Sequence, residues 1–297
     1  MNSITFKTGT GKKYHLEIDS MNPNILSAGS PGRVRKIADY LDNTKIIEGD
    51  RKMTVVHGEY GDLPVSAFPT GMGPASASVV IPEVIESVEG PITMIRLGTA
   101  GGLQPYINTG DIVIGTGAIR DESTTSAIID AEFPSISDPE LIPIIIGNAE
   151  MRGYEYEENL WTGIIHVKDD LYFKETPQFS PSREFREPKL KAYKRMGAVS
   201  SSMEFSVFTI LRDFYKGRRK NNISVGVLLA VISEVREEEH VKVDEEKKEK
   251  LEEDLIEIGL DVLKTSDHLR KGKKTEIEFE EIISKMIRSS TRSELLK

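Results

Sequence analysis

The sequence predicts a single α/β domain, because short apolar runs that suit strands alternate with longer runs that suit helices. Residues 224–232 are a continuous apolar run, which is typical of a strand buried on both faces. Residues 24–28 form another short apolar run, and the segment Gly29-Ser30-Pro31-Gly32-Arg33 follows it. Apolar residues then recur at helical spacing, so this part of the chain is expected to be a strand–glycine–helix unit.

The remaining elements follow from the same patterns. Strands are expected at residues 24–28, 53–59, 63–68, 92–97, from 112 to about 119, 160–167 and 224–232. Helices are expected at residues 34–41, 75–86, 139–151, 203–215, 243–269 and 275–287. Residues 169–188 are expected to be irregular, and loops of that length are usually functional. We expect residues 1–270 to form the domain and residues 271–297 to form a helical C-terminal extension.

Composition excludes several classes of function. The chain of 297 residues carries a net charge of −9, which disfavours a nucleic-acid or membrane-surface partner. It contains no cysteine, so disulfides and thiolate chemistry are excluded. Its histidines are scattered without ligand spacing, and no metal site is expected. Apolar runs stay below the roughly 18 residues that a membrane span needs, and we expect a cytoplasmic protein.

The segment 96–102, Arg-Leu-Gly-Thr-Ala-Gly-Gly, is the strongest local indication of function. An apolar run ends here in what we interpret as a glycine-rich turn. Glycines let backbone N–H groups approach an anion closely, and arginine adds a permanent charge with several donors. The same pattern also suits an ordinary tight turn. The segment 29–33 is a second candidate anion site, because the start of a helix attracts negative charge.

Several such segments occur in the order found in one family. They are residues 28–34, 70–73, 96–102, 108–111, 133–134, 202–204 and 232–234. With these segments the chain resembles the nucleoside phosphorylases of the uridine phosphorylase and hexameric purine nucleoside phosphorylase type, over roughly residues 14–265. The resemblance implies a three-layer α/β/α sandwich with a mixed central sheet. It also implies a hexamer built from dimers whose subunits share their sites.

The resemblance implies phosphorolysis, in which inorganic phosphate attacks C1′ of a nucleoside and releases a base and ribose 1-phosphate. No cofactor is then expected beyond phosphate and the nucleoside. The residues that match the family's phosphate contacts are Gly29, Arg33, Arg51, Arg96 and Thr99, with Arg51 contributed by a neighbouring subunit. The residues that match its ribose contacts are His15, Met203 and Glu204, with His15 reaching a neighbour's 5′-hydroxyl.

Catalysis is assigned to Arg96 and Glu234. Glu234 follows the last buried strand, where family members that act on purines place an aspartate, and partial burial would raise its pKa so that it donates to the base. The residues expected at the base are Leu171, Tyr172, Glu175 and Arg236. Glu175 and Pro177 replace the glutamine and arginine of uridine phosphorylases, and Ser202 replaces a usual glutamate.

These features predict a phosphate-dependent nucleoside phosphorylase, a pentosyltransferase, with uridine favoured over a purine nucleoside. Two alternatives stay open. One is a nucleosidase or phosphorylase of the methylthioadenosine type; a nucleosidase uses water and does not need the arginines. The other is a nucleoside-binding protein that has lost catalysis, which the replacements at Ser202, Glu234 and Glu175 would fit.

Overall fold

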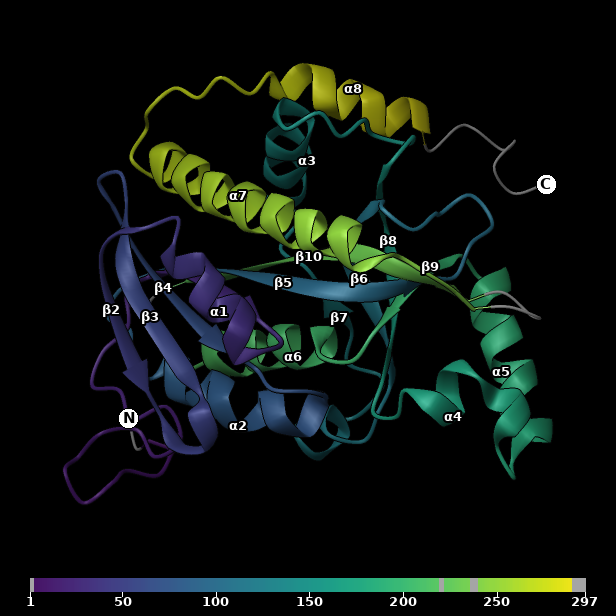
Figure 1. The fold of residues 1–297 in the computed structure, drawn as a ribbon, viewed down its shortest axis with the longest axis horizontal. Helices are drawn as coiled ribbons and strands as arrows, with labels where there is room; N and C mark the ends of the chain where they lie inside the picture. The colour runs from purple at the N-terminus through teal and green to yellow at the C-terminus, as the bar shows by residue number, and fades with distance from the viewer. Residues whose placement is uncertain (1–2, 219–221, 236–239, 290–297) are drawn as a thin grey trace.

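A mixed sheet lies at the centre of the computed structural model, which describes residues 3–218, 222–235 and 240–289 (Figure 1). Its strands are β1 (Asn24–Ala28), β2 (Asp42–Glu48), β3 (Thr54–Tyr60), β4 (Leu63–Pro69), β5 (Ile92–Gly102), β6 (Ile112–Asp121), β7 (Ser135–Ile136), β8 (Leu160–Lys168), β9 (Ala198–Ser202), β10 (Ile223–Val235) and β11 (His240–Lys242). Strand β5 is central, because it runs parallel to both β1 and β10.

The sheet closes on itself at one end. Strand β10 pairs antiparallel with β6, and β6 pairs parallel with β8. Strand β8 pairs parallel with β9, and β9 returns to β5 in an antiparallel pair. The other end is open, with β1, β4, β3 and β2 following β5 in that order. The closed end brings the carboxyl ends of β5, β8 and β10 close to one another.

Helices cover both faces of this sheet (Figure 1). The helices are α1 (Pro31–Ala38), α2 (Pro74–Ile85), α3 (Leu141–Met151), α4 (Tyr172–Glu175), α5 (Arg183–Arg195), α6 (Phe205–Lys216), α7 (Glu245–Arg270) and α8 (Phe279–Ser289). Helices α2 and α6 bury their apolar residues in one core cluster, and α1, α3 and α7 bury theirs in another. The predicted three-layer α/β/α architecture with a mixed sheet is therefore confirmed. No helix within the described ranges is long and apolar enough to cross a membrane.

The C-terminal helix α8 packs on α3. Ile282 is buried in the same core cluster as the residues of α3 and α7. Lys285 Nζ lies 3.0 Å from a carboxylate oxygen of Glu150, at the end of α3. Gly147 of α3 is needed here, because a Cβ at that position would lie 2.6 Å from Ile277. The division of the chain at residue 270 stays a prediction.

Some elements differ from those expected. Strand β5 continues through Gly102, so the predicted glycine-rich turn after Leu97 is wrong. Strand β2 was not predicted, because it is an exposed edge strand whose sequence is mainly polar. Helix α5 begins within the segment expected to be irregular; Leu190 is its one buried residue, which leaves little hydrophobic periodicity to detect.

Candidate active site

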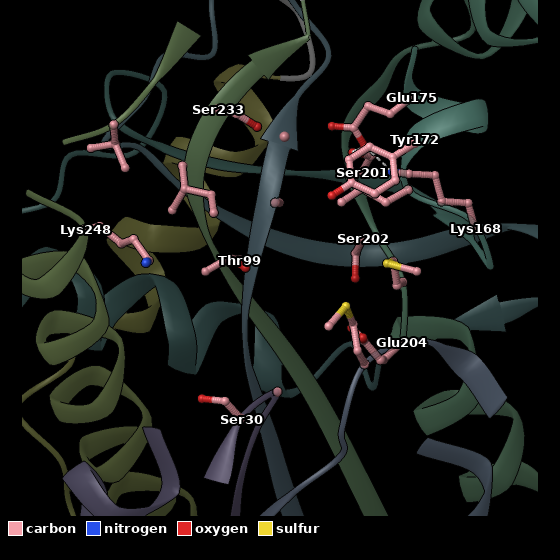
Figure 2. Close-up of a pocket in the computed structure, with 18 of the residues that line it drawn as sticks. Ser30, Thr99, Lys168, Tyr172, Glu175, Ser201, Ser202, Glu204, Ser233 and Lys248 are labelled. Atoms are coloured by element: carbon pink, nitrogen blue, oxygen red, sulfur yellow. Dashed lines mark hydrogen bonds and ion pairs between the residues drawn. The ribbon is translucent and has the colours of Figure 1, made fainter. Parts of the chain in front are cut away.

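A cavity of about 700 Å³ opens at the closed end of the sheet (Figure 2). Its walls come from the loop after β1, from β5, from α4, from β9, from the end of β10 and from the first turns of α7. The predicted site residues that line it are Gly29, Arg33, Arg96, Thr99, Leu171, Tyr172, Glu175, Met203 and Glu204. A cavity of this size suits a small organic ligand.

One end of the cavity is formed by the start of α1. The Ser30 hydroxyl accepts a hydrogen bond from the Arg33 backbone N–H at 3.2 Å and caps the helix, and Pro31 occupies its first turn. Arg33 is held by Glu252 of α7, with 2.8 Å between Nη2 and Oε1. The Nε of Arg33 is buried and has no protein partner among the described residues. This end therefore presents a helix start and a guanidinium, which suit an anion.

Arg96 lies on β5 beside this helix start and is almost completely buried. Its Nη2 donates to Glu204 Oε2 at 2.8 Å, and its Nη1 donates to the Leu97 carbonyl oxygen. Burial lowers the pKa of Arg96, and the Glu204 carboxylate opposes that shift. Arginine stays charged in proteins, so a buried positive charge faces the cavity.

Glu204 is fixed from two sides. Its other oxygen, Oε1, accepts the Gly73 backbone N–H at 2.8 Å. Gly73 has φ +86°, a conformation that favours glycine and that aims this N–H at the carboxylate. Met203, the residue before Glu204, lines the cavity next to it. The Glu204 carboxylate is therefore a fixed hydrogen-bond acceptor beside the end of the cavity that contains Arg33 and Arg96, the arginine end.

The glycines of β5 serve packing more than anion binding. A Cβ on Gly98 would lie 2.5 Å from Leu229 of β10, so a side chain at residue 98 would not fit between the paired strands. Thr99, the next residue, is half-buried and lines the cavity. The strand thus supplies Arg96 and Thr99 as side-chain donors, rather than a loop of free N–H groups.

The opposite end of the cavity contains Tyr172, Glu175, Lys168 and Ser201 (Figure 2). The Lys168 ammonium contacts Glu175 Oε2, and the Ser201 hydroxyl donates to the same oxygen at 3.0 Å. Tyr172 is 73% exposed and Leu171 is 40% exposed, although both line the cavity. This end combines exposed apolar surface with one fixed, charged acceptor.

Glu234 is not brought to the cavity. The register of β10 against β5 shifts between Val231 and Ser233, which places Ile232 and Ser233 in the cavity wall. Such a bulge re-aims the side chains that follow it. The Glu234 carboxylate is buried and accepts the backbone N–H of Thr109 at 3.1 Å. It supports the 108–110 turn in this structure.

The residues assigned to a neighbouring subunit also lie outside the cavity. His15 Nδ1 is 2.8 Å from Glu83 Oε1. The Arg51 side chain is 81% exposed, with its Nε 3.7 Å from Asp50. Both roles concern a subunit interface and stay predictions. Arg236 lies outside the described residues.

The residues of the cavity wall that were missed in the sequence include Lys168, Ser201 and Lys248. Lys168 ends a buried strand, which is an unusual place for a lysine and could have drawn attention. Ser201 lies in β9, a strand that was not predicted. Lys248 lies on α7 in a run of charged residues that suggests a solvated helix, and nothing in the local pattern distinguishes it. Within the described ranges, no cluster of three or more histidine, aspartate or glutamate residues is arranged to hold a metal ion.

The fold and the cavity define an α/β protein with two arginines, Arg33 and Arg96, at one end of a ligand-sized pocket. The chain belongs to the Phosphorylase superfamily, whose family model matches residues 24–264. It is 29% identical to a uridine phosphorylase of Treponema pallidum over 75% of this chain and 83% of that protein. It is 32% identical to a guanosine phosphorylase of Halorubrum lacusprofundi over 57% of this chain and 68% of that protein.

A solved structure shares the fold. The crystal structure of a uridine phosphorylase from Vibrio fischeri matches with a TM-score of 0.70 and 21% identity, over 87% of this chain and 99% of that one. At this level of identity the match establishes the architecture of the chain.

Proposed function

We propose that the protein is a phosphate-dependent nucleoside phosphorylase that cleaves the N-glycosidic bond and releases a base and ribose 1-phosphate. The observation that carries the proposal is the arrangement of Arg33, Arg96 and Thr99 at one end of a cavity whose middle holds Glu204. A nucleosidase would need no such anion site. The names of the relatives, uridine phosphorylases and a guanosine phosphorylase, favour uridine, with a purine nucleoside as the second candidate.

Phosphate binds at the start of α1 in this proposal. Gly29 has no side chain to occupy this space. A Cβ built on Gly29 would lie 3.7 Å from its nearest neighbour, Arg96 Nη2, so the space beside residue 29 is open to phosphate. The guanidinium groups of Arg33 and Arg96 offset the charge of the dianion, and the Thr99 hydroxyl donates to one of its oxygens. One phosphate oxygen then attacks C1′. The C1′–N bond breaks as the C1′–O bond forms, and the base leaves with the electron pair of the broken bond.

Glu204 orients the sugar. Its carboxylate, fixed by Gly73 and Arg96, accepts hydrogen bonds from the 2′- and 3′-hydroxyls, and Met203 contacts the apolar face of the ribose. A negative charge close to the ring also stabilises the positive charge that develops on the sugar in the transition state. The link between Arg96 and Glu204 couples the nucleophile site to the ribose site.

We further propose a homo-oligomer, a hexamer built from dimers, in which His15 and Arg51 complete a neighbour's site. The exposure of Arg51 supports this assignment, because its guanidinium is available to a neighbouring chain. Light scattering measures the assembly directly. A fully active monomer would contradict the shared site and would leave the fold assignment intact.

Product analysis tests the proposed reaction. The purified protein is incubated with uridine, inosine, guanosine, adenosine and cytidine, each with and without inorganic phosphate. We expect free base and ribose 1-phosphate to appear in equal amounts, and only when phosphate is present. Cleavage that is independent of phosphate would identify a nucleosidase. Saturable nucleoside binding without cleavage would identify a binding protein.

A further inference from the structure

The end of the cavity opposite the arginines holds a charged cluster formed by Lys168, Glu175 and Ser201 (Figure 2). Lys168 ends β8, Glu175 ends α4 and Ser201 lies in β9, so three separate elements build the cluster. The Lys168 side chain is 1% exposed and the Glu175 side chain is 11% exposed. Burying two charges is costly unless they are paired, and here they are paired next to a cavity.

Glu175 is held in one orientation. The Lys168 ammonium and the Ser201 hydroxyl both contact its Oε2 atom, the hydroxyl at 3.0 Å. The second oxygen, Oε1, has no hydrogen bond to the rest of the described chain and is the oxygen that a ligand in the cavity can engage. An ionised carboxylate can only accept hydrogen bonds, whereas the ammonium can only donate them. The cluster thus offers a fixed acceptor with a fixed donor beside it.

This donor–acceptor pair matches one kind of base edge. Uracil, hypoxanthine and guanine each present a ring N–H next to a carbonyl oxygen, which is a lactam edge. Glu175 accepts the ring N–H, and Lys168 donates to the adjacent carbonyl. The Ser201 hydroxyl donates its one proton to Glu175, so its lone pairs remain free to accept from the amino group of guanine. Adenine and cytosine instead present an unprotonated ring nitrogen next to an amino group.

The charge of Lys168 favours the lactam edge further. When the base leaves with the electron pair of the glycosidic bond, a lactam base delocalises negative charge onto its carbonyl oxygen. An ammonium beside that oxygen forms a charge-assisted hydrogen bond that strengthens as the charge develops. Adenine has no oxygen on which to carry this charge. The cluster would therefore act on departure of the base as well as on binding.

We propose that Glu175 and Lys168, with Ser201 as a positioning residue, select nucleosides whose base carries a lactam edge. This inference rests on the proposed phosphorylase function and specifies its substrate class. It includes both uridine and guanosine, and it excludes adenosine and cytidine as good substrates. Tyr172 lies at the same end and offers an aromatic surface that any base can contact, so it does not decide between bases.

The test compares kcat/KM for five nucleosides at saturating phosphate. For the native protein we expect uridine, inosine or guanosine to exceed adenosine and cytidine by about 100-fold, the upper range for one paired edge contact. Glu175→Gln keeps the size of the side chain but adds an amide donor, so this ratio should fall about tenfold. Lys168→Met should lower kcat for lactam nucleosides more than it raises their KM. Glu184→Gln, on the exposed side of α5, is the matched control and should leave the ratio unchanged.

Each outcome separates this inference from the proposed function. Phosphate-dependent cleavage that prefers adenosine or cytidine would overturn the inference and retain the phosphorylase. An unchanged ratio in a folded Glu175→Gln protein, with native thermal unfolding, would also overturn it. If no nucleoside is cleaved, the same ratio is measured from dissociation constants for the five nucleosides. Equal affinities would then reject the inference, and the absence of cleavage would reject the enzyme.

Discussion

The two ends of the cavity are built in different ways. At the arginine end, Arg33 and Arg96 extend from α1 and β5, which are packed in the central layers of the fold. At the other end, Glu175 and Tyr172 extend from α4, a short helix between β8 and β9 at the edge of the molecule (Figure 1). The core thus fixes the proposed anion site, while an excursion from the core, together with the ends of β8 and β9, forms the proposed site for the base. This difference suits a fold that keeps one nucleophile and varies the leaving group.

The largest effect should come from removing the central arginine. Arg96→Ala should lower kcat/KM for phosphate by about 10²- to 10³-fold, as expected when a preorganised charge that stabilises the transition state is lost. Steady-state kinetics at varied phosphate measures this effect. If the two ends of the cavity act independently, the ratio of kcat/KM between uridine and adenosine should stay within about threefold of the native value.

Arg96→Lys serves as the control for charge alone. Lysine keeps the positive charge but loses the planar fork that reaches both Glu204 and phosphate, so it should recover only part of the activity. Thermal unfolding of both variants should show that the fold persists. Native phosphate kinetics in folded Arg96→Ala protein would remove Arg96 from the phosphate site.

The difference between the ends also explains what could be predicted from the sequence. The segments 29–33 and 96–99 each lie at a strand end, and their local patterns predicted two candidate anion sites; the resemblance to the nucleoside phosphorylases then grouped Arg33, Arg96 and Thr99. Lys168 and Ser201 meet Glu175 because β8 pairs with β9, and a local pattern does not contain that long-range pairing. The charged cluster was therefore missed, although Glu175 itself was named.

Glu234 shows a second limit of local patterns. The resemblance matched Glu234 to the residue that family members acting on purines place after the last buried strand, which predicted that it faces the base. One irregular position in β10, between Val231 and Ser233, is enough to change which side chain enters the cavity. Ser233 lines the wall, and Glu234 instead holds the turn at Thr109.

A moderate effect should come from replacing Lys248. The variant tests whether Lys248 contacts phosphate in addition to Arg33 and Arg96. Lys248 lines the cavity from α7, and its Nζ lies 3.0 Å from Glu245, which also lines the cavity. We expect its ammonium to exchange this exposed partner for phosphate when the anion binds. Lys248→Ala should raise KM for phosphate about tenfold, in line with the loss of one charged hydrogen bond.

The matched control for that variant is Lys250→Ala on the same helix. Lys250 is 75% exposed, pairs with Asp254 at 3.5 Å and does not line the cavity. It should leave both Michaelis constants unchanged. An equal change in KM for phosphate and for nucleoside in Lys248→Ala would place Lys248 in general packing of the cavity wall rather than at the anion.

The smallest effect should come from replacing Asp121. This residue attaches α4 and α5, at the end of the cavity opposite the arginines (the outer end), to the central sheet. Asp121, the last residue of β6, accepts from His166 Nε2 at 3.0 Å and is paired with Lys174 of α4 and Lys189 of α5. Burial would raise the pKa of Asp121, but the hydrogen bonds from His166 and Lys189 outweigh it and lower the pKa to about 2. The ionised Asp121 therefore stabilises the folded state above its unfolded pKa of about 3.9.

Below that pH the stabilisation by Asp121 should decrease, because the unfolded chain takes up the proton first. The stabilisation is lost completely as the pH falls through about 2, where the folded protein is protonated as well. Asp121→Asn should cost about 1–2 kcal/mol of unfolding free energy at pH 7, with partial exposure of the lysines reducing the effect, and about half as much near pH 3, which lies between the folded and unfolded pKa values. Urea unfolding of both proteins at the two pH values measures this difference. At pH 7 the variant should raise KM for the nucleoside about two- to threefold and leave KM for phosphate unchanged, since only the outer end loosens. A stability difference that is the same at both pH values would show that Asp121 acts through packing and not through its charge.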